Sequence, residues 1–369
     1  MNANALDMEL LKLSLSPIAP WVDDPEVTDI LVYGSRKVYV RRRGGAFTSV
    51  DAKWYSNADL MTAAKTIGRQ MARRLDSREP ILDARLPDKS RVNVIVDPCY
   101  HRGACIVIRK FPENQLLLND LIQFGSVDQA GATILEAIVR LGKNMLISGG
   151  TGSGKTTLLN CLCSFIPEND VVVTVEDARE ISIPNELWVA LETKRALDPD
   201  DREVTLRDLV RTSLRLNPRW VIVGEVRGPE ALDLVRAFNT GHSGAGTIHS
   251  NSAYDALLAL EGLILQSGLD VPARAVKEMV SRAIHVVIQM GELSDHSRRL
   301  MEIAEVQGLD YDRSATFPPY KLRPLYQFEF QHFEADGKTH GQFKVREIPS
   351  WVKDLQRIPN YQMPDFWRQ

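Results

Sequence analysis

One stretch of the sequence has the residue types and spacing of a phosphate-binding loop. Residues 149–156, Gly-Gly-Thr-Gly-Ser-Gly-Lys-Thr, match the pattern G-x-x-x-x-G-K-[ST] in full. Glycines here let consecutive backbone N–H groups converge on phosphate oxygens without side-chain clashes. The apolar run 145–147 predicts a strand before the motif, and residues 157–165 predict a helix whose N-terminus faces the same anion. The structural setting that the motif requires is therefore predicted as well.

The loop residues are expected to share the work on a bound nucleoside triphosphate. Lys155 would reach the β- and γ-phosphates, and the Thr156 hydroxyl would ligate Mg²⁺. The predicted nucleotide-binding residues are Gly150, Thr151, Gly152, Ser153, Gly154, Lys155, Thr156 and Thr157.

Two carboxylates stand at the ends of predicted strands. Residues 171–175 form an apolar run that ends at Glu176, and residues 220–224 form another that ends at Glu225. Open α/β sheets place their ligands at the carboxyl ends of parallel strands. Hydrolysis needs a group that orients or deprotonates water, and usually a second acidic group near the metal. Glu225 and Glu176 are candidates for these functions, although a carboxylate at a strand end can also be merely solvated.

Two histidines lie near the end of a further predicted strand, residues 245–248. His249 ends this strand, where it could sense the γ-phosphate or hydrogen-bond a catalytic carboxylate. A satisfied structural histidine is the alternative. His242, in the preceding turn, is as readily structural as functional.

Arginines before residue 112 are candidates for a contribution from a second domain or subunit. Charge builds up on the γ-phosphoryl oxygens in the transition state, and such an arginine accelerates hydrolysis by about 10³–10⁵. Ordinary surface arginines on strands are the alternative. The candidates are Arg85, Arg91, Arg102 and Arg109.

The elements that must position these residues predict two kinds of unit. A hairpin at residues 30–40, a helix over 57–74 and strands at 91–96 and 105–111 predict an α+β unit. After it, apolar strands alternate with helices, which indicates an α/β fold with a mostly parallel sheet covered on both faces. A helix opens at the capping box Ser126-x-x-Gln129, and a late hairpin spans 285–290 and 300–308. The predicted domains are an N-terminal domain (1–111), a linker (112–122), an NTPase domain (123–310) and a strand-bearing C-terminal extension (311–369) with a loose end from residue 350.

Composition narrows the class of protein. The 369 residues are 44% hydrophobic and 25% charged, which excludes a mostly disordered or collagen-like chain. The formal net charge of −3 gives no general electrostatic grip on nucleic acid. No apolar run is long enough to span a membrane, and the acidic residues near the N-terminus do not fit a signal peptide. The four cysteines form no C-x-x-C pair, which suits a reducing cytosol.

Four segments together resemble the secretion-superfamily ATPases, which drive type II secretion, type IV pili and type IV secretion. The sequence lacks the C-x-x-C…C-x-x-C module of the type II secretion motors and so differs from that branch. Residues 83–93 and 305–308 look most like the CpaF/TadA type, the motor of Tad (Flp) pili. The four segments are 149–157, 175–177, 214–228 and 240–249, and they resemble that family's Walker A, Asp box, Walker B and His box.

The resemblance implies a RecA-like P-loop NTPase core preceded by a smaller α+β, PAS-like domain, with ATP and Mg²⁺ as cofactors. Glu225 would activate the attacking water, and Glu176 would support Mg²⁺ or the water. His249 would bridge the γ-phosphate to the rest of the machine. The resemblance supports Arg91 and the pair Arg102 and Arg109 as the arginines that reach the nucleotide.

The implied assembly is a homo-hexamer. It would associate peripherally with the cytoplasmic face of a bacterial inner membrane, act on platform proteins and so move pilin indirectly, without a nucleic-acid partner. The alternative is the same ATPase serving type IV secretion or conjugation. A RecA-like helicase and a non-enzymatic, nucleotide-gated scaffold are further alternatives of other classes.

Overall fold

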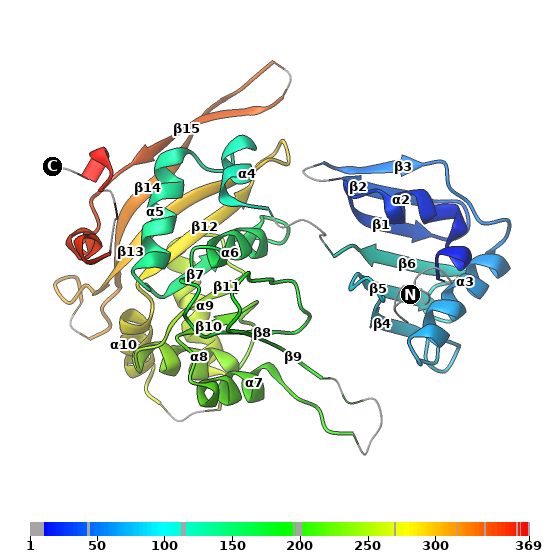
Figure 1. The fold of residues 1–369 in the computed structure, drawn as a ribbon, viewed down its shortest axis with the longest axis horizontal. Coiled ribbons are helices and arrows are strands. Elements are labelled where there is room, and N and C mark those ends of the chain that lie inside the picture. The colour runs from blue at the N-terminus through cyan, green and yellow to red at the C-terminus, as the bar shows by residue number, and fades with distance from the viewer. Residues whose placement is uncertain are drawn as a thin grey trace. The chain divides into compact units, whose positions relative to one another are not determined.

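The computed structural model describes most of the chain as two compact units, residues Met1–Asn114 and Gln115–Gln369 (Figure 1). The predicted boundary at residue 111 lies close to this division. The predicted linker, 112–122, differs from the structure because its last residues already begin the helix α4, Leu118–Gln123. The described residues are 11–42, 45–111, 116–194, 196, 201–268, 271–314, 316–335, 337–358, 361 and 363–367.

The first unit is an antiparallel sheet with its apolar side chains on one face. The six strands have the order β3-β2-β1-β6-β5-β4. Alternate residues such as Ile30, Val92 and Ile108 are buried together with residues of helix α3. The predicted hairpin is confirmed, but α3 ends at Gln70 because Ala72 takes a left-handed conformation (φ 50°). The elements are η1 (Ser16–Ile18), α2 (Ala19–Asp23), β1 (Val27–Tyr33), β2 (Val38–Arg42), β3 (Phe47–Val50), α3 (Asn57–Gln70), β4 (Ile81–Arg85), β5 (Arg91–Val96) and β6 (Ala104–Arg109).

The second unit is built on a mixed sheet of nine strands, in the order β15-β14-β13-β12-β7-β11-β10-β8-β9. The six strands from β12 to β9 pair in parallel, and β13 to β15 pair antiparallel. The strands are β7 (Met145–Ser148), β8 (Val172–Glu176), β9 (Trp188–Glu192), β10 (Trp220–Val223), β11 (Ser243–Ile248), β12 (Val286–Glu292), β13 (Arg298–Leu309), β14 (Tyr320–Phe333) and β15 (Thr339–Val345).

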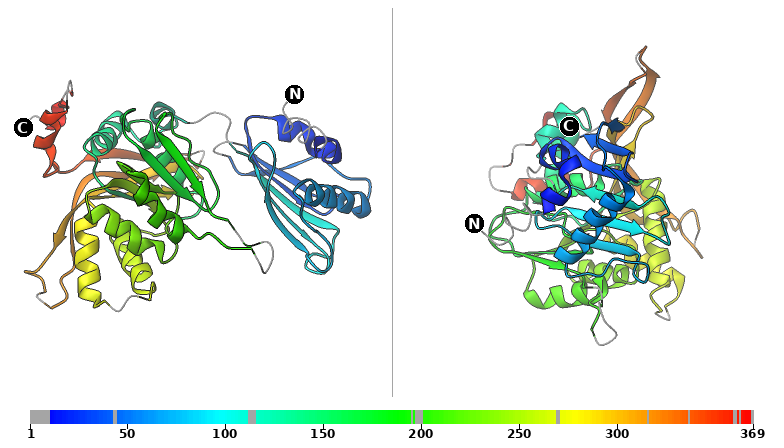
Figure 2. Two further views of the ribbon diagram at one scale, coloured as in Figure 1. Left: turned by 60° about the horizontal axis from the view of Figure 1, so that its bottom comes forward. Right: turned by 90° about the vertical axis from the view of Figure 1, so that its right-hand side faces the viewer.

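Helices cover both faces of this sheet (Figure 2). Alternate residues of β10 point to opposite sides: Trp220 and Ile222 join one apolar cluster, and Val221 and Val223 join the other. The central parallel strands β7, β8, β10 and β11 are therefore buried along their whole length, as predicted. The helices are α5 (Gln129–Arg140), α6 (Lys155–Cys163), α7 (Leu206–Ser213), η2 (Leu214–Leu216), α8 (Glu230–Asn239), α9 (Ala253–Leu265), α10 (Ala273–Ala283), η3 (Val352–Arg357) and η4 (Asp365–Trp367).

The start of α5 corrects one prediction. The helix does begin at Gln129, but its cap is Asp128 and not the predicted Ser126. The Asp128 carboxylate accepts a hydrogen bond from the Gly131 N–H at 2.8 Å and another from the Tyr326 hydroxyl at 2.7 Å. Asp128 therefore caps α5 and at the same time links the helix to β14, which Ser126 does not do.

The C-terminal segment also differs from the prediction. Strands β14 and β15 continue the main sheet, so the predicted extension shares one sheet with the phosphate loop. The end expected to be loose is anchored, because Trp351, Leu355 and Trp367 are buried in the same cluster as α5 and α6. Among the described residues, the helices are all too short or too polar to cross a membrane.

Candidate nucleotide site

The phosphate loop joins β7 to α6 with a backbone that only glycine adopts readily. Gly149, Gly152 and Gly154 have φ values of 155°, 79° and 95°. A Cβ atom at Gly149 would lie 2.5 Å from both the Met290 carbonyl and the Ser153 hydroxyl. Gly154 directly precedes α6, so the N–H groups of the first helical turn remain available to an anion.

Lys155 lies inside the loop. Its ammonium donates to the carbonyl oxygens of Gly149 and Gly150, each at 2.8 Å. Burial lowers the pKa of Lys155, and the nearby charge of Glu225 opposes that effect. A Cβ at Gly150 would meet nothing within 4 Å. An ammonium, a helix N-terminus and open space beside the backbone together fit a triphosphate, with Thr156 and Thr157 on the first turn of α6.

Glu225 follows β10, and each of its carboxylate oxygens lies beside a basic side chain, although only Oε2 accepts a hydrogen bond in the described part of the chain. Its Oε1 lies 2.7 Å from Nε2 of His249, and its Oε2 pairs with the guanidinium of Arg227. Burial acts to raise the pKa of Glu225, but the hydrogen bond from Arg227 and the charges of Arg227, His249 and Lys155 lower it overall. Glu225 is therefore ionised at neutral pH. His249 therefore lies close to the carboxylate, but its expected hydrogen bond to Glu225 is not formed in this structure.

Glu176 ends β8 in a drier environment. Its Oε1 accepts the backbone N–H groups of Glu180 and Ile181 at 2.9 and 3.0 Å, and its Oε2 is buried with no hydrogen-bond partner in the described part of the chain. Burial raises the pKa of Glu176 to about 7. A Cβ at Gly224 would lie 2.9 Å from the Glu176 Cγ. The missing side chain at Gly224 thus leaves room for the Glu176 side chain beside the end of β10.

The described residues hold no group of three metal-ligating side chains. Magnesium commonly keeps several waters and is held by one or two protein groups together with substrate phosphates. The buried Glu176 Oε2, which has no hydrogen-bond partner in the described part of the chain, is compatible with that mode.

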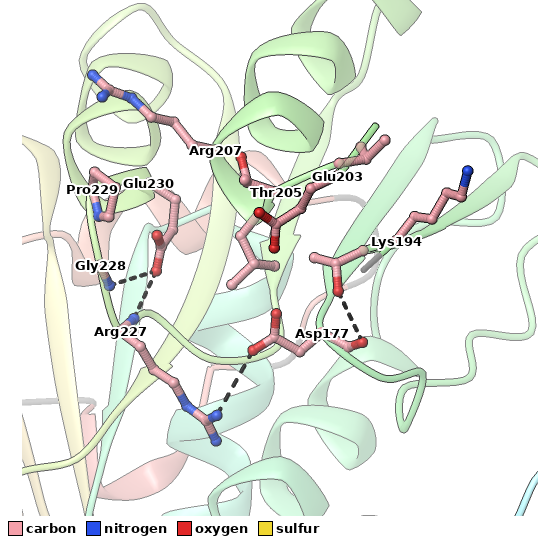
Figure 3. A pocket seen from close by; sticks show the side chains of 12 residues that line it. Asp177, Lys194, Glu203, Thr205, Arg207, Arg227, Gly228, Pro229 and Glu230 are labelled. Atoms are coloured by element: carbon pink, nitrogen blue, oxygen red, sulfur yellow. Dashed lines mark hydrogen bonds and ion pairs between the residues drawn. The ribbon is translucent and has the colours of Figure 1, made fainter. Parts of the chain in front are cut away.

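A cavity of about 460 Å³ lies beside this site (Figure 3). Arg227 lines it and pairs with Asp177 at 3.7 Å, while it also reaches Glu225. Glu230 fixes the turn, because its Oε1 accepts the N–H groups of Arg227 and Gly228 at 2.7 and 2.8 Å. Arg227 therefore connects the cavity to the carboxylate.

The predicted arginines all belong to the first unit. Arg109 donates to Asp29 at 3.1 Å, and Arg41 donates to the same carboxylate at 2.8 Å. Asp29 is only 4% exposed, so the two arginines balance a buried charge. Arg91 stands opposite Arg109 in the β5–β6 register, and Arg102 lies exposed in the loop before β6. The phosphate loop belongs to the second unit, together with Glu225, Glu176 and His249.

His242 has a structural role. Its Nδ1 lies 3.1 Å from the Ala237 carbonyl and 3.3 Å from the Thr240 hydroxyl, at the end of α8. It therefore satisfies the C-terminus of the helix.

Comparison with known families identifies the group to which this site belongs. Residues 12–321 match the family model described as type II/IV secretion system protein. The chain is a member of the type II/IV secretion system protein family.

Relatives within the type II/IV secretion family include proteins of very different length. The chain is 32% identical over 301 residues to an uncharacterized protein of Methanocaldococcus jannaschii, MJ0900, and covers 80% of itself but only 53% of that protein. It is 32% identical over 310 residues to the putative conjugal transfer protein Rv3659c of Mycobacterium tuberculosis, covering 82% of itself and 87% of the relative. The chain thus spans about half the length of the first relative.

Solved structures show the same fold. The ATPase DotB of Legionella pneumophila has a TM-score of 0.58 at 20% identity, over 78% of this chain and 79% of that one. The pilus retraction motor PilT with bound ADP has a TM-score of 0.53 at 20% identity, over 76% and 77%. The α/β fold with its mixed sheet is shared with these ATPases.

Two residues of this secretion-family site were not among the predicted ones. Arg227 follows Glu225 by two positions, so its place in the segment 214–228 could have identified it. Arg298 begins β13 and donates from Nε to the Gly152 carbonyl at 2.6 Å. No local pattern indicates Arg298, because a distant hairpin brings it to the loop.

Proposed function

We propose that the protein binds ATP with Mg²⁺ at residues 149–157 and hydrolyses it to drive a secretion or pilus machine. The observation that supports this most directly is the position of Glu225, which interacts electrostatically with Lys155 while Nε2 of His249 lies 2.7 Å from its Oε1. A phosphate-binding loop and an oriented, ionised carboxylate are the groups that triphosphate hydrolysis requires.

Each side chain then has a distinct task. The loop amides and Lys155 bind the phosphates, and Thr156 with the ionised form of Glu176 would hold Mg²⁺, which would supply charge neutralisation. Glu225 accepts a proton from the attacking water, because it is ionised and lies between Arg227 and His249. His249 directly follows β11, so it links the position of the Glu225 carboxylate to that strand.

We propose a RecA-like core for the second unit and a PAS-like domain for the first. The protein would act as a homo-hexamer at the cytoplasmic face of the inner membrane, where it contacts platform proteins. Arg91, Arg102 or Arg109 would then reach a nucleotide in a neighbouring subunit. The antiparallel sheet that carries these arginines in a unit of its own is compatible with that arrangement.

The machine is a Tad (Flp) pilus in the first form of this proposal, and residues 83–93 and 305–308 support it. A type IV secretion or conjugation system is the second form, and the similarity to a putative conjugal transfer protein supports it at least as well. Deletion of the gene in its host separates them: loss of surface fibres supports the first, and loss of DNA or protein transfer with intact fibres supports the second.

Two variants of the full chain test the proposed activity. Lys155→Ala should weaken ATP binding by about 10- to 100-fold, measured by calorimetry, because a charge-assisted contact is lost. Glu225→Gln should bind ATP normally but lower phosphate release by about 10²–10⁴. Glu136→Gln, at a half-buried carboxylate on α5 paired with Arg140, is the matched control. Normal turnover in Glu225→Gln would contradict the assignment of the catalytic base.

A further inference from the structure

The hairpin formed by β12 and β13 lies against the outside of the phosphate loop. Nε of Arg298 donates to the Gly152 carbonyl at 2.6 Å. The Met290 carbonyl closes the space beside Gly149, and the Glu292 carboxylate lies 3.2 Å from the position of a Cβ at Gly152. The loop is thus contacted by both strands of a hairpin more than a hundred residues away in sequence.

The turn of this hairpin is fixed in its own right. Asp295 accepts the N–H of Ser297 at 2.9 Å and the N–H of Thr339 at 2.7 Å. Partial burial acts to raise the pKa of Asp295, but these hydrogen bonds and that of the Ser297 hydroxyl hold it well below its usual range. Thr339 begins β15, beyond the residues that match the family. The C-terminal hairpin therefore braces the turn from which Arg298 reaches the loop.

The bond to Gly152 has a consequence for the next amide. A peptide unit is rigid and planar, so the Gly152 carbonyl and the Ser153 N–H point in opposite directions. When Arg298 holds the carbonyl outward, the Ser153 N–H is directed across the loop. There it meets the Gly150 carbonyl at the long distance of 3.4 Å, which leaves the amide weakly satisfied. A phosphate oxygen would be the stronger acceptor.

We propose that Arg298 is a positioning residue for the nucleotide, which holds the Gly152–Ser153 peptide in the orientation that presents its N–H to the phosphates. This inference rests on the proposed nucleotide binding and adds a residue to it. Arg298 acts from behind the loop through the backbone, so it raises affinity without taking part in cleavage.

Arg299 supplies a matched control. It is the next residue of β13, but its Nη1 donates to the Phe124 carbonyl at 3.2 Å, and within the described part of the chain it makes no hydrogen bond to the loop. Both side chains are partly buried, so each is replaced by methionine, which keeps the apolar stem. Arg298→Lys keeps the charge and a donor.

The experiment measures binding of Mg·ADP and Mg·ATP to the full chain by calorimetry, together with steady-state hydrolysis. Arg298→Met should raise the Kd and KM about tenfold while kcat stays within about threefold. Arg298→Lys should recover most of the affinity, and Arg299→Met should match the unmodified protein. A Kd for Arg298→Met equal to that of Arg299→Met would overturn the inference.

A second readout needs no nucleotide. Hydrogen exchange at the amides of residues 152–155 should be faster in Arg298→Met than in Arg299→Met, because the loop loses its outer bond. Unchanged exchange would also overturn the inference. If the unmodified protein binds neither nucleotide while exchange responds as expected, the proposed function fails and the role of Arg298 in holding the loop stands.

Discussion

Nε2 of His249 lies 2.7 Å from Oε1 of Glu225, and the two residues follow neighbouring parallel strands, β11 and β10. A second contact links the same strands, since the Thr247 hydroxyl donates to the Gly224 carbonyl at 2.6 Å. Arg227 pairs with the other oxygen, so the Glu225 carboxylate lies between two basic side chains. We therefore expect His249 to help orient this carboxylate through its charge contact with Oε1.

Replacement of His249 by alanine should lower turnover by up to about a hundredfold, because a misplaced base loses much of its catalytic effect. Its affinity for ATP should stay near normal, since the phosphate loop is untouched. His242→Ala is the control, because that imidazole caps α8 instead. Hydrolysis and calorimetry on the purified variants check this, and equal losses of turnover in both would remove His249 from the site.

A methyl group at Gly224 should disturb Glu176. The added Cβ would lie 2.9 Å from the Glu176 Cγ, so Gly224→Ala must displace the buried carboxylate. We expect a loss of about 1–3 kcal/mol in the free energy of unfolding and a lower rate of hydrolysis.

Gly262→Ala provides the comparison for this substitution. Gly262 lies within α9, where a Cβ would meet nothing within 4 Å. The free energy of unfolding of that variant should rise by about 0.5–1 kcal/mol, because alanine is more favourable than glycine in a helix interior. Urea unfolding measures both, and a neutral Gly224→Ala would show that Glu176 does not depend on the space at Gly224.

Burial of Glu176 should make stability depend on pH. Its pKa rises from 4.5 to about 7 in the folded protein. Between these values the folded state holds a proton that the unfolded state has lost, so the free energy of unfolding falls as pH rises and levels off above pH 7. The change is about 3 kcal/mol over the window.

Glu176→Gln tests this, because an amide imitates the protonated acid at every pH. Urea unfolding is measured at pH 5 and pH 8. From the lower to the higher pH, the free energy of unfolding should fall more for the unmodified protein than for Glu176→Gln. Parallel changes in both proteins would mean that other groups cause the pH dependence.

The strand, loop and helix around the phosphate site could be predicted because their determinants are local. The glycines of residues 149–154 and the apolar run before them specify the motif and its setting together. The strand ends at Glu176, Glu225 and His249 follow from hydrophobic patterning in the same way. The contact between His249 and Glu225 then requires only that β10 and β11 be neighbours.

Features that depend on distant residues could not be predicted. Arg298 reaches Gly152 only because β12 pairs with β7 and turns back as β13. Asp128, and not the predicted Ser126, caps α5, and the Tyr326 hydroxyl from β14 donates a hydrogen bond to it. The C-terminal segment expected to be loose is held by two buried tryptophans, Trp351 and Trp367, whose ring centroids lie 5.9 Å apart.

Arg109 and Arg102 should differ in what their loss affects. Asp29 is buried and takes hydrogen bonds from Arg41 and Arg109, so Arg109→Ala leaves it with one cationic partner. Because Arg109 itself is 59% exposed, we expect a modest loss of about 1 kcal/mol in the free energy of unfolding. Arg102 is exposed, and Arg102→Ala should leave stability unchanged.

Turnover at equal ATP affinity distinguishes structural arginines from catalytic ones. If Arg102 stabilises transition-state charge in a neighbouring subunit, Arg102→Ala lowers kcat without raising the Kd, and the loss appears only at concentrations where the protein assembles. Arg109→Ala should lower kcat only as far as the smaller fraction of folded protein explains. Urea unfolding, calorimetry and hydrolysis at several protein concentrations check both variants. A normal kcat for assembled Arg102→Ala would leave Arg91, opposite Arg109 on β5, and Arg85, at the end of β4, as the remaining predicted candidates.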